Sequence, residues 1–165
     1  MSRAGGRSIS PATPEDWSAI WPIFHEVVEA GETYAYPAGL DSDAARDLWF
    51  SDPHVVVLEE DGRVWGTAKM GPNRPGNGAH VGTASFMVSS AARGRGVGRA
   101  LGEYAVAWHR AGGFRGIQFN AVVETNTAAV RLWESLGFTI VGTVPGAFRS
   151  PTHGYVGLHV MYLAL

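Results

Sequence analysis

Hydrophobic residues in the first third of the chain recur at helical spacing. A helix start precedes them at residues 13–16 (Thr-Pro-Glu-Asp), where the threonine can cap the helix and the proline fits its first turn. Gly31 then ends the predicted helix. A short strand around Ile9 is predicted before this helix, and a second, short helix over residues 42–51 after it. The apolar face of the first helix consists of Trp17, Ile20, Phe24, Val27 and Val28.

The middle of the chain has the alternating pattern of β-strands. Residues 54–60 (HVVVLEE) and 63–70 (RVWGTAKM) flank Asp61-Gly62, which is a two-residue hairpin turn signal. Residues 71–80 form a loop rich in glycine and proline, and residues 81–88 (VGTASFMV) follow as a third strand. This segment therefore predicts a three-stranded meander.

After the meander, helices and strands alternate. The predicted helices are 97–112 and 127–136, and the predicted strands are 115–123, 138–144 and 154–163. No repeat or linker interrupts this order, so the sequence predicts one α/β domain over residues 1–165, built on a single mixed sheet.

Composition and charge remove several classes of protein. The chain is 45% hydrophobic and has no cysteine, which excludes a disordered protein, disulfides and thiol chemistry. Thirteen basic and 15 acidic residues give a net charge of −2, which argues against nucleic-acid binding by bulk charge. The chain has no apolar run of about 20 residues and no apolar core near its N-terminus, so neither a membrane span nor a signal peptide is expected. We expect a cytoplasmic protein.

Two further kinds of site are unlikely on motif grounds. Lys69 is the sole lysine and follows an alanine, so the Walker phosphate-binding loop is absent. The string His25-Glu26-x-x-Glu29 lacks the second histidine of a zinc-protease motif, and no metal site is predicted.

The most informative stretch is a glycine-rich turn between a strand and a helix, residues 88–101 (VSSAARGRGVGRAL). Glycine permits a left-handed backbone and close approach to a ligand. The first N–H groups of the following helix have no helical partners, and the helix dipole makes that end electropositive. Arg93, Arg95 and Arg99 add positive charge, so the turn is suited to a phosphate or pyrophosphate. A dinucleotide fingerprint would require glycine where Arg99 stands.

The turn and a second motif together resemble one enzyme family. R-x-x-G-x-G, from Arg93 to Gly98, resembles the acyl-CoA pyrophosphate motif of the GNAT superfamily of N-acetyltransferases. Residues 126–138 (NTAAVRLWESLGF) are similar to that family's N-x-x-A-x-x-x-Y-x-x-x-G-F signature. The resemblance implies a GNAT-like domain with a mixed, mostly antiparallel sheet and helices on both faces. It also implies direct acetyl transfer from acetyl-CoA, as co-substrate, to an amine in a ternary complex.

The resemblance assigns a set of cofactor-binding residues. The strand before the turn would pair with the pantetheine arm through its backbone, and N–H groups of residues 95–99 would hold the pyrophosphate. Asn126 would lie near the thioester, although its position also fits a plain helix cap. Trp133 stands where many relatives have tyrosine, so the family's proton donor to the leaving thiolate is missing. The full set is Phe86, Met87, Val88, Arg93, Arg95, Gly96, Val97, Gly98, Arg99 and Asn126.

A closer resemblance suggests the acceptor. Residues 72–76 (PNRPG), 80–81 (HV) and 119–126 (FNAVVETN) look like those of the fungal acetyltransferases that detoxify azetidine-2-carboxylate and related proline analogues. Thr83 departs from that branch, where an asparagine stands. The expected substrate-binding residues are Tyr34, Tyr36, Thr83, Ser85, Phe119 and Asn120. Trp65 is a further candidate for the pocket wall, and the alternative for all these aromatic residues is ordinary core packing.

Deprotonation of the amine requires help, since an amine with a pKa near about 10 is almost fully charged at neutral pH. Glu124 and His80 are candidates, each acting through an ordered water, and the alternatives are a solvated carboxylate and a structural histidine. We therefore assign the catalytic positions to Asn126 and Glu124. The expected function is acetylation of a small amine, such as a cyclic imino acid, in detoxification or self-resistance. The alternatives are acetylation of a peptide N-terminus or lysine, and non-catalytic binding of acyl-CoA or a metabolite; a homodimer through the C-terminal strand is an expectation from family analogy.

Overall fold

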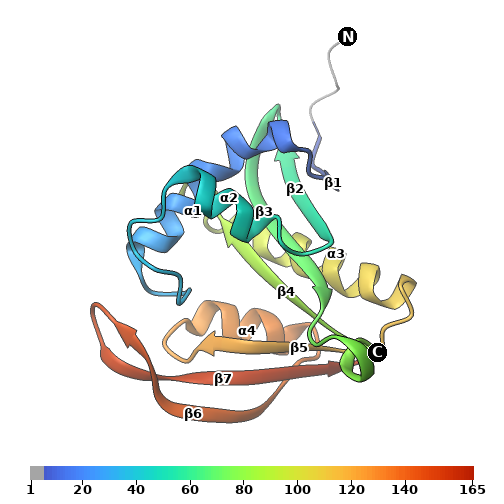
Figure 1. Cartoon of the computed structure of the whole chain (residues 1–165), viewed down its shortest axis with the longest axis vertical. Coiled ribbons are helices and arrows are strands. Elements are labelled where there is room, and N and C mark those ends of the chain that lie inside the picture. The colour runs from blue at the N-terminus through green and yellow to red at the C-terminus, as the bar shows by residue number, and fades with distance from the viewer. Residues whose placement is uncertain (1–5) are drawn as a thin grey trace.

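The computed structural model describes residues 6–165 and shows one seven-stranded sheet with four α-helices (Figure 1). The first five residues of the N-terminal stretch inspected for a signal peptide lie outside the described residues. The strands are β1 (Ser8–Pro11), β2 (His54–Glu60), β3 (Arg63–Pro72), β4 (Val81–Val88), β5 (Gly116–Val123), β6 (Thr139–Ser150) and β7 (Gly154–Ala164). The helices are α1 (Trp17–Ala30), α2 (Ser42–Trp49), α3 (Val97–Ala111) and α4 (Thr127–Ser135), with short 3₁₀ turns η1 (Pro14–Asp16), η2 (Gly76–Gly78) and η3 (Ser90–Ala92).

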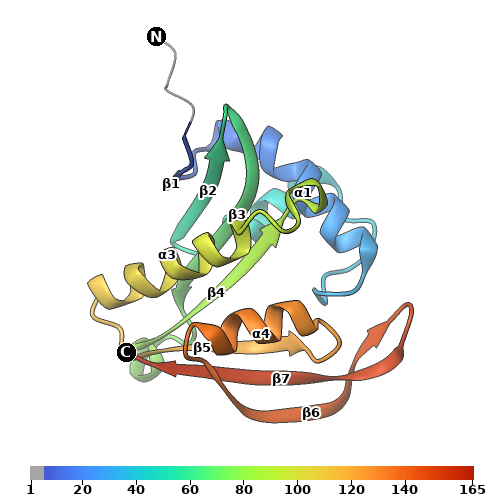
Figure 2. The same cartoon turned by 180° about the vertical axis from the view of Figure 1, so that it is seen from behind.

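The sheet has the order β1-β2-β3-β4-β5-β7-β6, and only the β4–β5 pair is parallel. Alternate residues of each strand point to opposite faces. Val55 and Val57 of β2 pack with α1 and α2, whereas Val56 and Leu58 pack with α3. The helices therefore cover both faces, as Figures 1 and 2 show, and the predicted fold class is confirmed.

Local signals set most of the element boundaries correctly. At the start of α1 the Asp16 carboxylate accepts a 2.7 Å hydrogen bond from the Thr13 N–H, and a 3₁₀ turn precedes the α-helix. Gly31 ends the helix with a left-handed backbone (φ +68°). The strand predicted over 138–144 was too short, because β6 continues to Ser150. A register shift between Val144 and Phe148 absorbs the intervening proline and glycine that predicted a break.

The β4–β5 pair holds together for only two residues before the strands diverge. Val81 pairs with Gly116 and Gly82 with Ile117, and no further pair continues this ladder. The imidazole of His109, on α3, lies directly on Gly82: a Cβ at that glycine would come within 2.3 Å of the ring Nε2. This close contact fixes the point from which the two strands separate.

Two other features of the core bear on later arguments. Lys69 is buried on the α2 side of the sheet, with its Nζ 3.1 Å from the Asp52 carboxylate and 3.2 Å from the Leu48 carbonyl. None of the helices within residues 6–165 has the length and apolar character needed to cross a lipid bilayer.

Candidate active site

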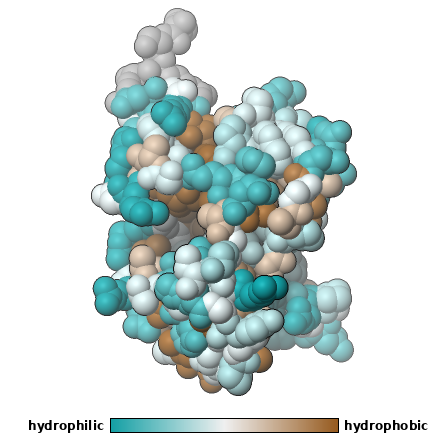
Figure 3. Space-filling view, turned by 90° about the vertical axis from the view of Figure 1, so that its left-hand side faces the viewer, coloured by the Kyte–Doolittle hydropathy of each residue, from teal (hydrophilic) through white to brown (hydrophobic). Residues whose placement is uncertain are grey.

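A cleft of about 460 Å³ opens where β4 and β5 diverge. Figure 3 shows a hollow between the two lobes of the molecule, with apolar side chains inside it. The α1–α2 loop bounds the cleft on one side, and β6 and β7 bound it on the other. All six residues predicted to bind the acceptor line it, as do Phe86, Met87, Val88, Gly98, Asn126 and Trp133. Other lining residues were not predicted from the sequence, and they include Val27, Thr33, Phe148 and Leu158.

The exposed backbone of β4 is already partly bonded within the chain. The Tyr34 hydroxyl donates to the Phe86 carbonyl (2.6 Å) and accepts from the Phe86 N–H (2.7 Å). Polar groups of an antiparallel pair alternate in direction, so the groups of Phe86 and Val88 face the cleft while those of Met87 face β3. The backbone N–H and carbonyl of Met87 are therefore not available for the predicted contact to pantetheine. Those of Val88 face the cleft and have no partner among the described residues.

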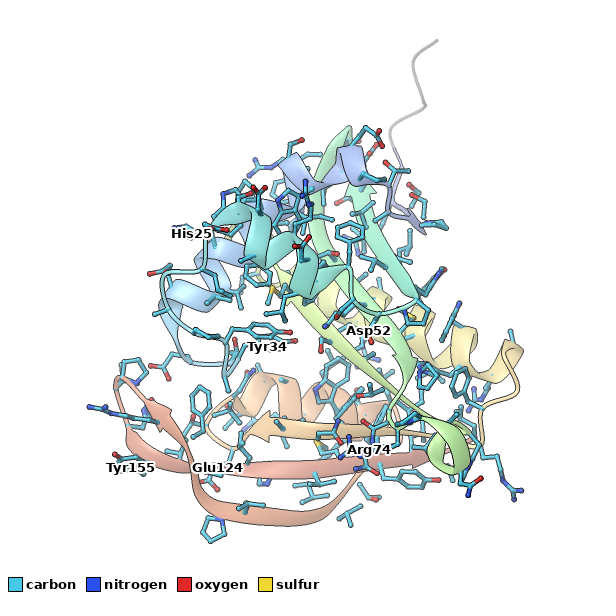
Figure 4. All side chains as sticks on the ribbon, viewed as in Figure 1. His25, Tyr34, Asp52, Arg74, Glu124 and Tyr155 are labelled. Carbon is cyan, nitrogen blue, oxygen red and sulfur yellow. The ribbon has the colours of Figure 1, made fainter. Side chains whose placement is uncertain are left out.

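Tyr34 and Tyr36 form a stacked aromatic wall. Their ring centroids lie 5.5 Å apart with an interplanar angle of 5°, and Figure 4 shows Tyr34 at the gap above β5. Burial raises the pKa of both hydroxyls, and the Asp52 carboxylate further helps to raise the pKa of Tyr36 to about 12. Both phenols therefore stay protonated and neutral at physiological pH.

The glycine-rich turn presents unpaired N–H groups, as an anion site requires. Gly94 and Gly96 are left-handed (φ +77° and +73°), and α3 begins immediately afterwards. The N–H groups of Gly96, Val97, Gly98 and Arg99 find no acceptor among the described residues. That of Arg95 bonds to the Ala92 carbonyl instead, so the predicted anion site loses one of its five donors.

Two of the three arginines at this turn are engaged elsewhere. Arg95 contacts the Glu60 carboxylate at 2.5 Å, and its guanidinium lies 4.5 Å from the ring centre of Trp65. Arg99 donates to the Ser135 hydroxyl at 2.7 Å. All three arginines are exposed, and only the Arg93 side chain has no partner among the described residues. Trp65 belongs to this outer cluster, and the expectation that it walls the pocket is wrong.

Asn126 lies where it can fill both roles expected from the sequence, as the cap of α4 and as a contact to a ligand in the cleft. Its Oδ1 accepts from the Ala129 N–H at 3.4 Å and caps α4. The residue also lines the cleft, and its side-chain N–H₂ group has no acceptor among residues 6–165. It can therefore cap the helix and still donate to a bound group.

Trp133 fills the apolar inner end of the cleft. Its ring lies 4.7 Å from Phe86 and 4.9 Å from Phe119, measured between ring centroids. The indole is 93% buried, since its relative exposure is 7%. An indole N–H does not act as an acid, so this end of the cleft offers shape and apolar contact rather than a proton.

The polar side of the cleft lies on the face of β4 that carries α1 and α2. Thr83 and Ser85 are two residues apart on β4 and share that face. Asn120, from β5, donates to the Asn73 Oδ1 at 2.6 Å and accepts from Gln118 at 3.0 Å. Hydroxyl and amide groups thus surround the opening, and they can donate to or accept from a small polar ligand.

Neither candidate base lies in the cleft. The Glu124 carboxylate accepts from the Gly157 N–H at 2.7 Å, beside β7 (Figure 4). His80 is exposed on the loop before β4. Among the described lining residues there is no aspartate, glutamate or histidine. The lining of this cleft therefore supplies hydrogen bonds and apolar contact, whereas Glu32 and His153 line a smaller pocket that shares Thr33 and Asn126 with it.

A hydrogen-bonded bridge joins the two sides of the cleft. Glu32, just after α1, accepts from the Ser150 hydroxyl (2.7 Å) and the Thr152 hydroxyl (2.9 Å) at the tip of the β6–β7 hairpin. These two hydrogen bonds hold the pKa of the Glu32 carboxyl below its ordinary value, and the bond from Ser150 has the larger effect. The sequence could not reveal this contact, because its partners lie 118 and 120 residues apart.

Comparisons with known proteins agree with this geometry. The model of the acetyltransferase (GNAT) family matches residues 17–138. The N-acetyltransferase aca1 of Schizosaccharomyces pombe is 30% identical over 151 residues, covering 81% of this chain and 72% of that protein. A GCN5-related N-acetyltransferase from Kribbella flavida is 57% identical, with a TM-score of 0.93 over 96% of this chain and 98% of the other.

Two further solved structures are each 28% identical. The yncA acetyltransferase of Salmonella typhimurium was solved with its cofactor acetyl-CoA, and it has a TM-score of 0.81 over 97% of this chain and 94% of that one. The ribosomal-protein-alanine N-acetyltransferase of Brucella melitensis has a TM-score of 0.85 over 96% of this chain and 99% of that one.

The sheet splits beside a glycine-rich turn whose N–H groups have no acceptor within residues 6–165, and the proteins that share this fold place the chain among acyl-CoA-dependent transferases. The chain belongs to the acetyltransferase (GNAT) family, and it is an N-acetyltransferase that uses acetyl-CoA. When bound, acetyl-CoA supplies the reactive acetyl thioester. No group of three or more potential metal ligands occurs in the described part of the chain.

Proposed function

We propose that this acetyltransferase modifies a small amine, a cyclic secondary amine or imino acid of the azetidine-2-carboxylate type, in detoxification or self-resistance. The observation that carries the proposal is the small volume of the cleft. Its 460 Å³ lies at the small end of the range for ligand pockets, about 300–1,000 Å³, and must also admit the acetyl end of the cofactor. The space left suits a compact acceptor.

The bridge from Glu32 to the hairpin tip strengthens the argument for a small acceptor. It ties the α1–α2 loop to the β6–β7 hairpin, the two segments that bound the cleft. A peptide or protein acceptor needs a long open groove, and this bridge limits how far the two segments can separate. The aromatic pair Tyr34 and Tyr36 supplies an apolar wall for a ring, and Asn120 and Ser85 supply polar contacts for a carboxylate or amine.

We further propose that the cofactor binds along β4, with its diphosphate at the N–H groups of Gly96 to Arg99. Those four unpaired donors and the exposed Arg93 support this placement. Asn126 and the backbone of Val88 support contacts nearer the thioester. Glu124 is better placed to hold β5 against β7 than to take a proton from the acceptor.

A panel of acceptors tests the proposal. Purified protein with acetyl-CoA is expected to release free thiol with azetidine-2-carboxylate, proline or related cyclic amines, and far less with short peptides. A peptide N-terminus or lysine as the better acceptor would favour a peptide or protein substrate, and the Brucella melitensis neighbour is named for a protein substrate. Tight binding of a metabolite without any thiol release would indicate a non-catalytic binder. Either result would overturn the small-amine proposal.

A further inference from the structure

We propose that Arg7 is a positioning residue for acetyl-CoA: it holds the Arg95–Gly96 peptide so that the Gly96 N–H faces the cofactor's diphosphate. The inference rests on the cofactor placement proposed above. Arg7 precedes β1, far in sequence from the turn, and no motif of the turn includes it.

The key contact is made by a side chain to the backbone of the turn. The Arg7 guanidinium donates from Nη2 to the Arg95 carbonyl at 2.7 Å. Its Nη1 also lies 3.7 Å from the position that a Cβ would take on Gly96. Arg7 therefore covers the outer surface of the turn at the residue before α3.

Because the peptide unit is planar, a contact that holds the Arg95 carbonyl also sets the direction of the Gly96 N–H. The carbonyl of one residue and the N–H of the next belong to one planar unit, and in a trans peptide they point in opposite directions. No cis peptide occurs in residues 6–165. With the Arg95 carbonyl held outward by Arg7, the Gly96 N–H points to the other side of the turn, together with the free donors that open α3.

Without this contact the peptide would have an alternative orientation. Rotation of the Arg95–Gly96 unit changes ψ of Arg95 and φ of Gly96, and glycine accepts φ of either sign. Gly94 gives the turn similar freedom on the other side of Arg95. A turn with two glycines therefore needs an external contact to keep its donors aligned, and the Arg7 side chain provides one.

Glu60 holds Arg7 and Arg95 in this arrangement. Its Oε2 lies 3.4 Å from the Arg7 guanidinium and also contacts that of Arg95. The guanidinium groups of Arg63 and Arg95 both lie over the Trp65 ring, 4.1 and 4.5 Å from its centre. One carboxylate and one indole therefore fix the outer side of the turn, and the inner side remains for an anion.

Calorimetry on three variants of the full chain tests the inference. Arg7→Met removes the donors and keeps the aliphatic stem, and we expect acetyl-CoA to bind about ten-fold more weakly, the size of one lost charge-assisted hydrogen bond. S-acetyl-pantetheine, which lacks the diphosphate, should bind as to the wild type. Arg110→Met, an exposed arginine on α3, is the control for charge and should leave both affinities unchanged.

A second readout does not depend on the cofactor. In ligand-free protein, the amide signal of Gly96 in a ¹H–¹⁵N spectrum should shift or broaden in Arg7→Met and stay in place in Arg110→Met. If Arg7→Met does not fold, Glu60→Gln replaces it, with a smaller loss of about three-fold expected for acetyl-CoA alone.

Three results would overturn the role of Arg7. These are unchanged acetyl-CoA affinity in the folded variant, an equal loss for S-acetyl-pantetheine, or an equal loss in Arg110→Met. Gly96→Asp separates this failure from failure of the cofactor site itself. If Gly96→Asp abolishes binding and Arg7→Met does not, only the positioning role is wrong; if neither affects binding, the diphosphate lies elsewhere.

Discussion

At the scale of single residues, hydrogen bonds within the chain decide which groups of the cleft remain for ligands. The Tyr34 hydroxyl uses both polar groups of Phe86, and the Ala92 carbonyl uses the Arg95 N–H. A sequence motif assigns such groups to the cofactor because it records only which residue types are present. The direction of each N–H depends on the turn and on contacts far away in sequence.

Tyr34→Phe is expected to lower stability by about 1–3 kcal/mol, because it leaves the N–H and carbonyl of Phe86 without their partner. Urea unfolding measures this change. Tyr36→Phe is the matched control, since the Tyr36 hydroxyl has no hydrogen bond within the described residues and its loss should cost less. Equal effects of the two substitutions would contradict the role given to Tyr34.

Gly96→Asp should reduce acetyl-CoA affinity by more than about ten-fold, through a carboxylate beside the diphosphate and a left-handed backbone that a side chain disfavours. Calorimetry measures the affinity, and circular dichroism checks the fold. Gly113→Asp carries the same change at another left-handed glycine (φ +76°) with open space around it, and it should bind as the wild type does.

The acceptor-dependent rate should rise with pH about ten-fold per unit until the pH reaches the acceptor's own pKa. The described cleft contains no acidic or histidine side chain to take the proton, so the neutral amine has to form before transfer. Thiol release from pH 6 to 10 with azetidine-2-carboxylate provides the profile. The rate could instead level off at a lower pH than the pKa of the acceptor. If Glu124→Gln or His80→Gln removes that plateau, the substituted residue is a general base.

At the scale of elements, the sequence predicted nearly all helices and strands, because capping residues, glycine stops and the Asp61-Gly62 turn act locally. Asp61 and Gly62 do have the left-handed backbone that this hairpin turn requires (φ +53° and +76°). The length of β6 was missed, since a bulge across a Pro-Gly pair depends on the partner strand. The orientation of Arg95 and the position of Glu124 were missed for a similar reason: their partners, Glu60 and Gly157, are distant in sequence.

Glu32→Ala should loosen the β6–β7 hairpin and admit larger acceptors. The substitution leaves the Ser150 hydroxyl, in a residue only 3% exposed, without its acceptor. Hydrogen–deuterium exchange should become faster around residues 149–154, and acetylation of short peptides should increase. Glu29→Ala is the control, because Glu29, on α1, only accepts a 3.4 Å bond from the Gly39 N–H and does not contact the hairpin. Unchanged exchange at the hairpin would show that the bridge does not hold it.

At the scale of the whole molecule, a buried histidine at the branch point of the sheet couples stability to pH. Burial lowers the pKa of His109, and its bond to the Ala105 carbonyl opposes this only in part. Since the folded pKa lies below the unfolded value, the unfolded chain takes up the proton first as the pH falls. The stabilisation is therefore complete above about pH 6.5 and is lost as the pH drops toward the folded pKa.

His109→Gln should remove part of this pH dependence. The wild type is expected to lose up to about 1.4 kcal/mol per pH unit through this residue below pH 6.5. Urea unfolding between pH 5 and 8 measures the slope. His80→Gln, at an exposed histidine, is the matched control, and an equally steep slope in His109→Gln would contradict the assignment.

The burial of Lys69 has a practical consequence for an enzyme that works with a reactive thioester. Acyl-CoA compounds slowly modify free amines, and within residues 6–165 this chain has one side-chain amine, held beneath α2 by Asp52. Among the side chains of residues 6–165, spontaneous self-acylation therefore has no exposed amine as its target. When the enzyme is incubated with a test acceptor, acetyl groups found on lysine side chains by mass spectrometry can therefore be assigned to the acceptor, with little background from the enzyme.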